Sequence, residues 1–451
     1  MKIKTKQIKP VLWMLLSAMI LLWFGSVVAQ NEEENMTDST AVSDSVGTDS
    51  TADLYAHLPK DDQCISCHIE EEAMPEGFDP KDIHMKEGLS CAGCHGGDNS
   101  SNDEDEAMNE DIGFIGAPDK ADIPQMCGKC HSDINIMRKY NPQISTDQVS
   151  QYFQSMHGRK LKEGDENVAT CNDCHTAHSI MKHDDPRSTV YALNVPKTCN
   201  HCHGDEDYME EYDIPTDQYE KYAQSVHGKA LLEREDTGAP ACNDCHGNHG
   251  ATPPDVTSLV YVCGSCHVQN EQFFKESKMA HKWEEKQDKH FCVECHGNHD
   301  VVKPTDDFVG TQKGEAICVK CHKQGEKGYM IADTLHTLLK RATAAYDTAS
   351  ALKEKVLVVG MNDVEIDFLL QDAHQAIVHA RTTVHTFDPT KVREKTDEAL
   401  KNAHMAIELG KKELDDYDFR RMGLGVATLI ITLLAIALYI KIRDIEKGQN
   451  L

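Results

Sequence analysis

The chain is poor in the apolar residues from which a conventional protein core is built. Only 39% of its 451 residues are hydrophobic, only 6% are aromatic, and the hydrophobic share includes 18 cysteines. Such a composition excludes an ordinary aliphatic core across residues 55–325, so the buried apolar surface of that region must have another source.

Positive charge is scarce as well. The 46 Lys and Arg residues face 75 Asp and Glu residues, which gives a formal net charge of −29 at pH 7. An excess of carboxylates on this scale argues against nucleic acid as a partner and against peripheral docking on anionic lipid. A protein partner with a basic surface is the expectation.

No cysteine lies outside one short motif, because all 18 belong to a Cys-x-x-Cys-His sequence. A disulfide scaffold has no reason to place histidine after every second cysteine, and zinc sites built from Cys-x-x-Cys pairs do not require that histidine. The motif is instead the attachment signature of c-type haem, in which two thiols bond to the two vinyl groups and the imidazole becomes the proximal iron ligand. No cysteine precedes Cys64, which excludes a lipid-modified cysteine near the N-terminus.

Nine motifs predict nine covalently attached haems, whose apolar faces supply the buried surface that the side chains lack. No residue is assigned a catalytic role. The predicted attachment residues are Cys64, Cys67, Cys91, Cys94, Cys127, Cys130, Cys171, Cys174, Cys199, Cys202, Cys242, Cys245, Cys263, Cys266, Cys292, Cys295, Cys318 and Cys321. The predicted proximal ligands are His68, His95, His131, His175, His203, His246, His267, His296 and His322.

Other histidines recur at fixed places in a repeat that carries two haems. Two units have Ser-x-His-Gly before the first motif of the pair and a histidine three residues after it, a third unit is less regular, and a fourth, nearer the N-terminus, lacks the second histidine. The four units and the separate Cys64 motif account for nine haems. The recurrence predicts distal iron ligands, although the haem that each one serves stays open: His84, His157, His178, His227, His249, His281 and His299.

Four more histidines, without a recurring position, are weaker candidates for distal ligands: His57, His183, His201 and His290. No methionine recurs in the repeats, so imidazole is the expected distal ligand, and low reduction potentials follow because the thioether of His/Met cytochromes is missing. The glycine after His227 is interpreted as room for the backbone to pass close to a porphyrin face.

On these motifs the chain resembles the multihaem c-type cytochromes, a broad group that includes periplasmic electron carriers and multihaem reductases. The resemblance covers about residues 58–323. It implies haem c as the cofactor and electron transfer as the function. The long helices predicted behind this region resemble the C-terminal helices of the multihaem nitrite reductases and hydroxylamine oxidoreductases.

The rest of the chain divides by composition. Residues 1–29 combine lysines, an apolar run and a small-residue cleavage site, which is typical of an export signal, with an uncleaved anchor as the alternative. Residues 30–54 form an acidic linker with little to bury, residues 55–325 the haem domain and residues 326–420 a helical bundle. The acidic stretch 98–111 is interpreted as a solvated loop, because its carboxylates lack the fixed ligand spacing of a calcium site.

The predicted fold class is mainly α with much irregular structure: a haem-packed domain, an antiparallel helical bundle and one transmembrane helix. The first bundle helix is expected to end near Val358, and the second to begin at Asn362 with Glu365 completing a capping box. The third is expected to begin at Pro389 and to end near Asp418.

Residues 421–441 are predicted to cross the inner (cytoplasmic) membrane, because the nineteen residues from Met422 to Ile440 carry no charge and are long enough to span a hydrocarbon core. Residues 442–451 are then a cytoplasmic tail, and the haem domain lies on the periplasmic side. His374 and His385, three turns apart on the second bundle helix, are interpreted as core or surface residues, with a ligand role as the alternative.

Two functions are compatible with these features. The favoured one is electron transfer, as in anaerobic respiration, between a quinol-oxidising membrane complex and periplasmic redox proteins or other acceptors. The alternative is a multihaem reductase of nitrogen or sulfur oxyanions with one open iron. In the nitrite reductases that the chain resembles, lysine replaces the proximal histidine of the catalytic haem, whereas all nine motifs here end in histidine.

Overall fold

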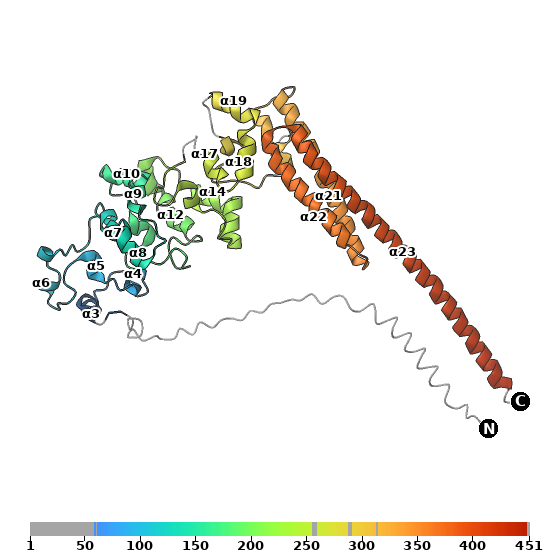
Figure 1. The fold of residues 1–451 in the computed structure, drawn as a ribbon, viewed down its shortest axis with the longest axis horizontal. Helices are drawn as coiled ribbons and strands as arrows, with labels where there is room; N and C mark the ends of the chain where they lie inside the picture. Colours follow the sequence, from blue (N-terminus) through green and yellow to red (C-terminus); the bar gives the residue numbers. More distant parts are fainter. Residues whose placement is uncertain (1–57, 60, 255–258, 287–290, 313, 449–451) are drawn as a thin grey trace. The chain divides into compact units, whose positions relative to one another are not determined.

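The computed structural model describes residues 58–448 except 60, 255–258, 287–290 and 313. The predictions for residues 1–29 and 30–54, and for His57 and His290, lie outside the described residues. The described residues belong to one unit, Leu58–Leu451. They form helices and irregular structure and contain no strand, which confirms the predicted fold class (Figure 1).

The haem-motif region consists of short helices joined by turns. Many begin at an acidic N-cap, as where the Asp62 carboxylate accepts a hydrogen bond from the Ile65 N–H at 3.2 Å. Helices this short are marginal in water on their own, so packing has to stabilise them. The stretch 98–111 differs from the expected loop, because Asp103 and Asn109 cap two short helices within it.

The first helices of this region are α3 (Gln63–Glu70), α4 (Ile83–Lys86), α5 (Cys91–His95), α6 (Glu104–Ala107), η2 (Glu110–Ile112), α7 (Ile123–His131), α8 (Ile134–Tyr140), α9 (Gln148–Tyr152), α10 (Met156–Lys162), α11 (Cys171–His175), α12 (Val195–His203), α13 (Glu206–Met209) and η3 (Glu210–Tyr212). The others are α14 (Gln218–Gln224), α15 (Val226–Gly228), η4 (Lys229–Glu233), α16 (Cys242–His246), α17 (Leu259–Gly264), α18 (Val268–Lys275), α19 (Lys278–Lys286), α20 (Phe291–His296), η5 (Asp306–Val309) and η6 (Cys318–Lys320).

Three long helices follow and pack side by side as a bundle: α21 (Lys327–Val358), α22 (Val364–Thr383), which continues into η7 (Val384–Thr386), and α23 (Pro389–Gly448) (Figure 1). Their core alternates leucine and isoleucine with fully buried alanines, whose small side chains let the helix backbones approach closely. The main buried residues are Leu335, Leu338, Leu339, Ala342, Ala349, Ile366, Ala373, Ala380, Val392, Ala399 and Ala406.

Two of the predicted bundle boundaries are confirmed and two are corrected. The first helix ends at Val358, and the third begins at Pro389. The Asp388 carboxylate caps the start of the third helix by accepting a hydrogen bond from the Thr390 N–H at 2.9 Å. The second helix has Asp363, not Asn362, as N-cap, and no capping box forms. The third helix does not end near Asp418, because it continues without a break into the apolar run and no proline follows Pro389 to interrupt it.

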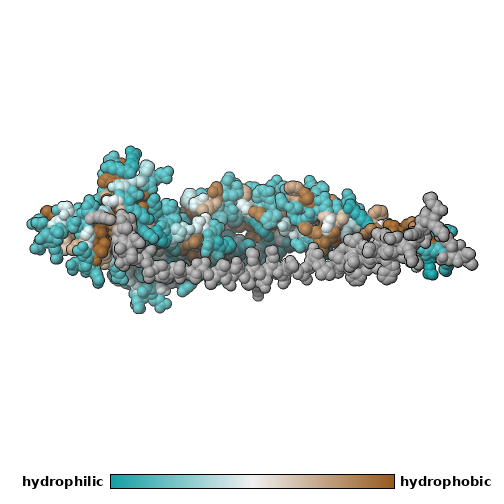
Figure 2. Space-filling view, turned by 90° about the horizontal axis from the view of Figure 1, so that it is seen from below, coloured by the Kyte–Doolittle hydropathy of each residue, from teal (hydrophilic) through white to brown (hydrophobic). Residues whose placement is uncertain are grey.

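The apolar run therefore forms the second half of α23. Its large side chains face outward in the structure, with Leu424 70% and Leu438 64% exposed. The helix is long and apolar enough to cross a membrane, and none of its most apolar window is buried by the protein. In Figure 2 hydrophobic colouring appears toward the C-terminal end of α23, whereas hydrophilic colouring predominates over the haem-motif region.

Candidate haem-binding sites

Several Cys-x-x-Cys-His motifs form, or end, a single helical turn. The helices α5, α11 and α16 consist of the five motif residues alone, and α7 and α12 end at the motif histidine. One turn places residues i, i+3 and i+4 on the same face, so both thiols and the imidazole face the same side. In two motifs an aspartate between the cysteines also caps the turn. The Asp173 carboxylate accepts a hydrogen bond from the Thr170 N–H, and the Asp244 carboxylate accepts one from the Ala241 N–H, both at 2.7 Å.

Six of the seven predicted distal histidines lie opposite a proximal histidine. The distances between ring centres fall in a narrow range: His84 to His131 6.1 Å, His178 to His95 6.2 Å, His157 to His203 6.1 Å, His249 to His175 6.1 Å, His227 to His267 6.3 Å and His299 to His246 5.9 Å.

These distances fit an iron between the two rings. A metal–imidazole bond of about 2 Å plus ~1.1 Å from the nitrogen to the ring centre puts two axial imidazoles about 6.2 Å apart, centre to centre. No group of three or more His, Cys, Asp and Glu side chains in the described residues converges on a metal position. A zinc ion would need such a group, whereas in haem the porphyrin supplies the other four ligands, so the residues fit haem iron.

The pairs follow one rule along the repeats. The histidine before the first motif of a unit faces the second motif of its own unit, as His157 faces His203. The histidine after the first motif faces the first motif of the preceding unit, as His249 faces His175. Each unit thus contributes a side chain to the haem site of the unit before it.

A repeated backbone hydrogen bond joins neighbouring units at this point. The N–H before the leading histidine donates to the carbonyl two residues after the trailing histidine of the next unit. The bond occurs three times: Ile83 to Ile180 at 2.8 Å, Met156 to Ala251 at 3.0 Å and Val226 to Val301 at 2.8 Å. Because it lies beside both histidines, it sets the register between units.

The Ser-x-His-Gly sequence is a helix start that orients the histidine. The Ser225 hydroxyl accepts from the Gly228 N–H at 3.0 Å and donates to the Tyr222 carbonyl at 2.6 Å, and Ser155 does the same in the other unit. A Cβ on Gly228 would lie 1.9 Å from that carbonyl oxygen. This corrects the interpretation of the glycine, because its close neighbour is the protein's own backbone.

Replacing Gly228 with Ala is expected to destabilise the fold by about 1–3 kcal/mol, because a methyl group has no room beside Tyr222. Chemical denaturation of the haem-loaded protein measures the change. Gly250 is the matched control, since the nearest atom to its added Cβ is 4.0 Å away, and Gly250→Ala should stay within about 0.5 kcal/mol. Equal stabilities of the two variants would contradict the role given to Gly228.

Some predicted residues have no imidazole opposite them among the described residues. His281 is exposed at 63% of its side chain and lies 3.8 Å from Glu284, so its ligand role stays a prediction. The proximal His68 contacts the Ala73 carbonyl at 3.1 Å, and His322 lies 3.6 Å from Glu326. His183 and His201 are exposed.

One contact was missed by the sequence interpretation. His385, in η7, lies 6.1 Å from the proximal His296, within the range of the six pairs above. His374 behaves as expected of a bundle residue, since it packs on Tyr346 at 5.6 Å. Nothing in the sequence distinguishes His385 from His374 and His379 on the same stretch, and no repeat position reveals a partner 89 residues away.

Several of the buried histidines in these pairs have a lowered pKa, which favours the neutral imidazole. Burial is the main cause that lowers the pKa of His175 and His296 to about 4, and neighbouring histidines lower it further. Burial likewise lowers the pKa of His157, His203 and His249. A neutral imidazole is the form that binds iron, so the polypeptide presents these rings ready for coordination.

Motifs that are consecutive in the sequence are also neighbours in space. A hydrogen bond with the Cys171 thiol is the main cause that lowers the pKa of Cys127 to about 7. The pKa of Cys94 is raised, mainly by burial and to a smaller extent by the nearby Cys127. In the same way, a cysteine of each motif shifts the pKa of a cysteine in the neighbouring motif. The interacting pairs are Cys64 with Cys91, Cys94 with Cys127, Cys127 with Cys171, Cys174 with Cys202, Cys199 with Cys242, Cys245 with Cys263, Cys263 with Cys292 and Cys295 with Cys318.

Together the helical fold, the attachment turns and the imidazole pairs are similar to those of multihaem c-type cytochromes. Residues 83–204 match the family model of cytochrome c3. This segment contains four of the nine motifs, and its match supports covalently bound haem c and a multihaem electron-transfer cytochrome. No curated protein and no solved structure matches the chain.

Proposed function

We propose that the protein is a membrane-anchored cytochrome with nine c-type haems that transfers electrons between a quinol-linked membrane partner and extracytoplasmic acceptors. The observation that carries the proposal is the set of imidazole pairs whose ring centres lie 5.9 to 6.3 Å apart. When bound, each haem supplies a one-electron iron couple. Two axial imidazoles fill both open positions of an iron, which leaves outer-sphere electron transfer as its reaction.

In this proposal the eighteen motif cysteines attach the haems and the nine motif histidines are the proximal ligands. His84, His157 and His227 are the distal ligands within their own units, and His178, His249 and His299 are those that reach back to the unit before. Bis-imidazole coordination without methionine keeps the reduction potentials low. His281 is assigned to the iron of His322 by the same repeat rule.

The order of the motifs supports a single path for electrons. Helices that carry consecutive motifs contact each other, as α3 does α5, α7 does α11, α12 does α16 and α17 does α20, so the chain would hold its haems in a row from the Cys64 motif to the Cys318 motif. The last motif contains η6 and is followed by α21, where the bundle begins. Electrons would therefore enter or leave near the bundle at one end of the row and at the Cys64 motif at the other.

The apolar half of α23 supports membrane attachment at the bundle end. We place this anchor in the inner membrane, with the haems on the periplasmic side, because c-type haem is attached after export and residues 1–29 have the features of an export signal. A membrane complex that oxidises quinol is the proposed partner at the bundle end, and a periplasmic redox protein with a basic surface suits the net charge of −29.

A reductase of nitrogen or sulfur oxyanions is the second candidate. It is favoured by one observation: among the described residues His68 and His322 have no imidazole opposite them. An open iron at either end of the row would be high-spin in the oxidised protein. Electron paramagnetic resonance decides between the two functions, because the electron carrier is expected to show low-spin ferric haem alone.

The haem number is tested by the intact mass of the exported protein. We expect the mass of the processed polypeptide plus nine haems, since every cysteine belongs to an attachment motif. The reduced pyridine haemochrome spectrum provides an independent haem-to-protein ratio. A mass that corresponds to free thiols, or to fewer than nine haems in a fully matured sample, would contradict the proposal.

A further inference from the structure

His385 comes from the bundle, yet its ring faces a haem motif in the same way as the paired histidines of the repeats. Its ring centre lies 6.1 Å from that of His296, and the two ring planes differ by 22°. The pairs formed by trailing histidines have ring planes 10° to 19° apart, whereas the pairs formed by leading histidines differ by 41° to 88°. By geometry His385 therefore belongs with the trailing histidines.

The repeat explains why a ligand from outside is needed here. The first motif of each of the three preceding units is faced by a trailing histidine of the unit that follows it. His296 belongs to the first motif of the last unit, and no further unit follows. His385 occupies the place that the trailing histidine of a next unit would have.

The ring of His385 is oriented for coordination. Its Nδ1 lies 2.9 Å from the Thr382 carbonyl oxygen, which can only accept, so Nδ1 carries the hydrogen. The lone pair is then on Nε2, which is the arrangement found in metal-bound histidines whose other nitrogen donates to a backbone carbonyl. The neighbours Val384 and Thr386 are buried in the bundle, so the backbone at His385 is fixed.

Aromatic packing connects this segment to the motif it faces. Phe387, two residues after His385, lies 6.4 Å from Phe274, and Phe274 lies 5.9 Å from Phe291, the residue before Cys292. The three phenylalanines belong to one apolar cluster with Trp283 and Cys292. The attachment turn and η7 are therefore parts of the same packed core.

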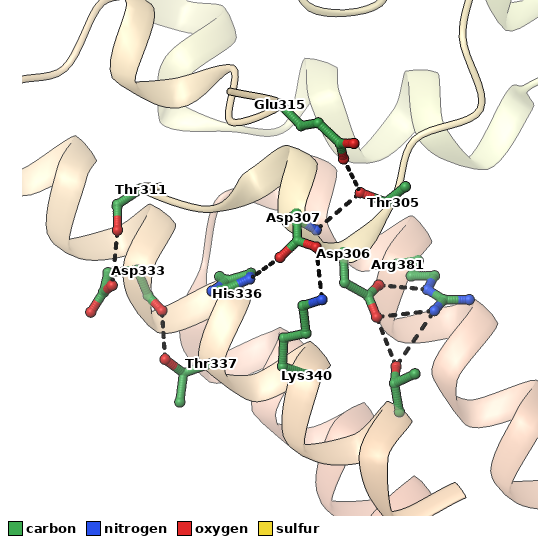
Figure 3. A network of polar contacts seen from close by, with 11 residues as sticks. Thr305, Asp306, Asp307, Thr311, Glu315, Asp333, His336, Thr337, Lys340 and Arg381 are labelled. Carbon is green, nitrogen blue, oxygen red and sulfur yellow. Dashed lines mark hydrogen bonds and ion pairs between the residues drawn. The ribbon is translucent and has the colours of Figure 1, made fainter. Parts of the chain in front are cut away.

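A short segment, η5, makes a second connection (Figure 3). The Asp306 carboxylate, 6% exposed, receives two hydrogen bonds from Arg381 at 2.8 and 3.1 Å, and Asp307 accepts from Lys340 at 2.8 Å. The next residue, Phe308, stacks on His296 at 5.3 Å. Because Arg381 lies one helical turn before His385, the same segment positions both rings of the pair.

We propose that His385 is the distal axial ligand of the haem attached at Cys292 and Cys295, with Arg381 and Asp306 as its positioning pair. The inference rests on the proposed haem at this motif and goes beyond it, because it makes the helical bundle a part of the haem chain. The bundle then links the row of haems to the membrane helix by a coordinate bond, and any displacement of α22 acts directly on one iron.

The test is His385→Ala in the full-length, haem-loaded protein. We expect one haem of nine to change from low-spin to high-spin in paramagnetic resonance and optical spectra, and added imidazole to restore the low-spin signal. The matched control is His374→Ala on the same helix, which should leave every haem low-spin, since His374 packs on Tyr346. His385→Met should keep nine low-spin haems and raise the potential of one.

The outcomes separate this inference from the proposed function. Nine haems by mass with an unchanged low-spin spectrum in His385→Ala would overturn the ligand role and leave the proposed function intact. A wild-type protein without haem at Cys292 and Cys295 would overturn both. If His385→Ala does not mature, His385→Met decides, because an unshifted set of nine potentials in that variant would also overturn the ligand role.

Discussion

Removal of residues 422–451 is expected to move the protein from the membrane fraction to the soluble fraction with all nine haems retained. The apolar side chains in the second half of α23, such as Leu424 and Leu438, are exposed. Among the described residues, α23 is the only helix that is long and apolar enough to cross a membrane. The bundle core ends before this segment, with Ala406 and Leu414 as its last contacts on α23. Fractionation and haem staining measure the result.

A shorter deletion provides the control for this experiment. Removing only residues 442–451 keeps the apolar run and should keep the protein in the membrane. If the protein without residues 422–451 remained membrane-bound with nine haems, the apolar run within residues 1–29 would be an uncleaved anchor. If it lost haem, the C-terminal half of α23 would be needed for maturation, which contradicts the absence of any motif or recurring histidine there.

Replacement of His227 with Ala is expected to convert one haem of nine to high spin. His227 lies 6.3 Å from His267 in the structure, and its helix start is held by Ser225 and Gly228. Loss of the imidazole would open one position on the iron of the His267 motif and change the potential of that haem alone. Paramagnetic resonance counts the high-spin haem, and a redox titration measures the potentials.

His201→Ala serves as the control, because His201 is exposed and lies between the two cysteines of a motif. This variant should keep nine low-spin haems. An ordinary surface role for His227 predicts the same silent result, with a stability change of about 0.5 kcal/mol or less. A low-spin spectrum in His227→Ala would therefore remove His227 from the set of ligands and weaken the rule that links the other leading histidines to their motifs.

The amino-acid sequence was sufficient for the features that depend on local chemistry. In several motifs, such as those of α11 and α16, Cys-x-x-Cys-His is a single helical turn, so the two thiols and the imidazole share a face there. Val358 and Pro389 end and begin their helices as predicted, since apolar periodicity and a proline at the first helical position act over a few residues. The length of the apolar run after Arg421 is likewise a local property.

Other local predictions were wrong where a neighbour in space mattered. Gly228 was interpreted as space for a porphyrin, but the atom that excludes a side chain is the Tyr222 carbonyl oxygen. The third bundle helix was expected to end near Asp418, but intrahelical hydrogen bonds continue through the apolar run and satisfy its backbone. The sequence also does not reveal that the His385 ring faces His296, because nothing in its own helix indicates this contact.

The sequence by itself located the nine predicted attachment motifs, because each motif needs only residues that are close together in the chain. The tertiary structure decided which histidines face each other, because the partners are far apart in the chain: His178 faces His95, His249 faces His175, and His385 faces His296. These contacts depend on the backbone bonds between units and on the packing of the bundle against the last unit. The facing of two imidazoles across such distances is a property of the folded chain, since each ring is positioned by residues far from it in the sequence.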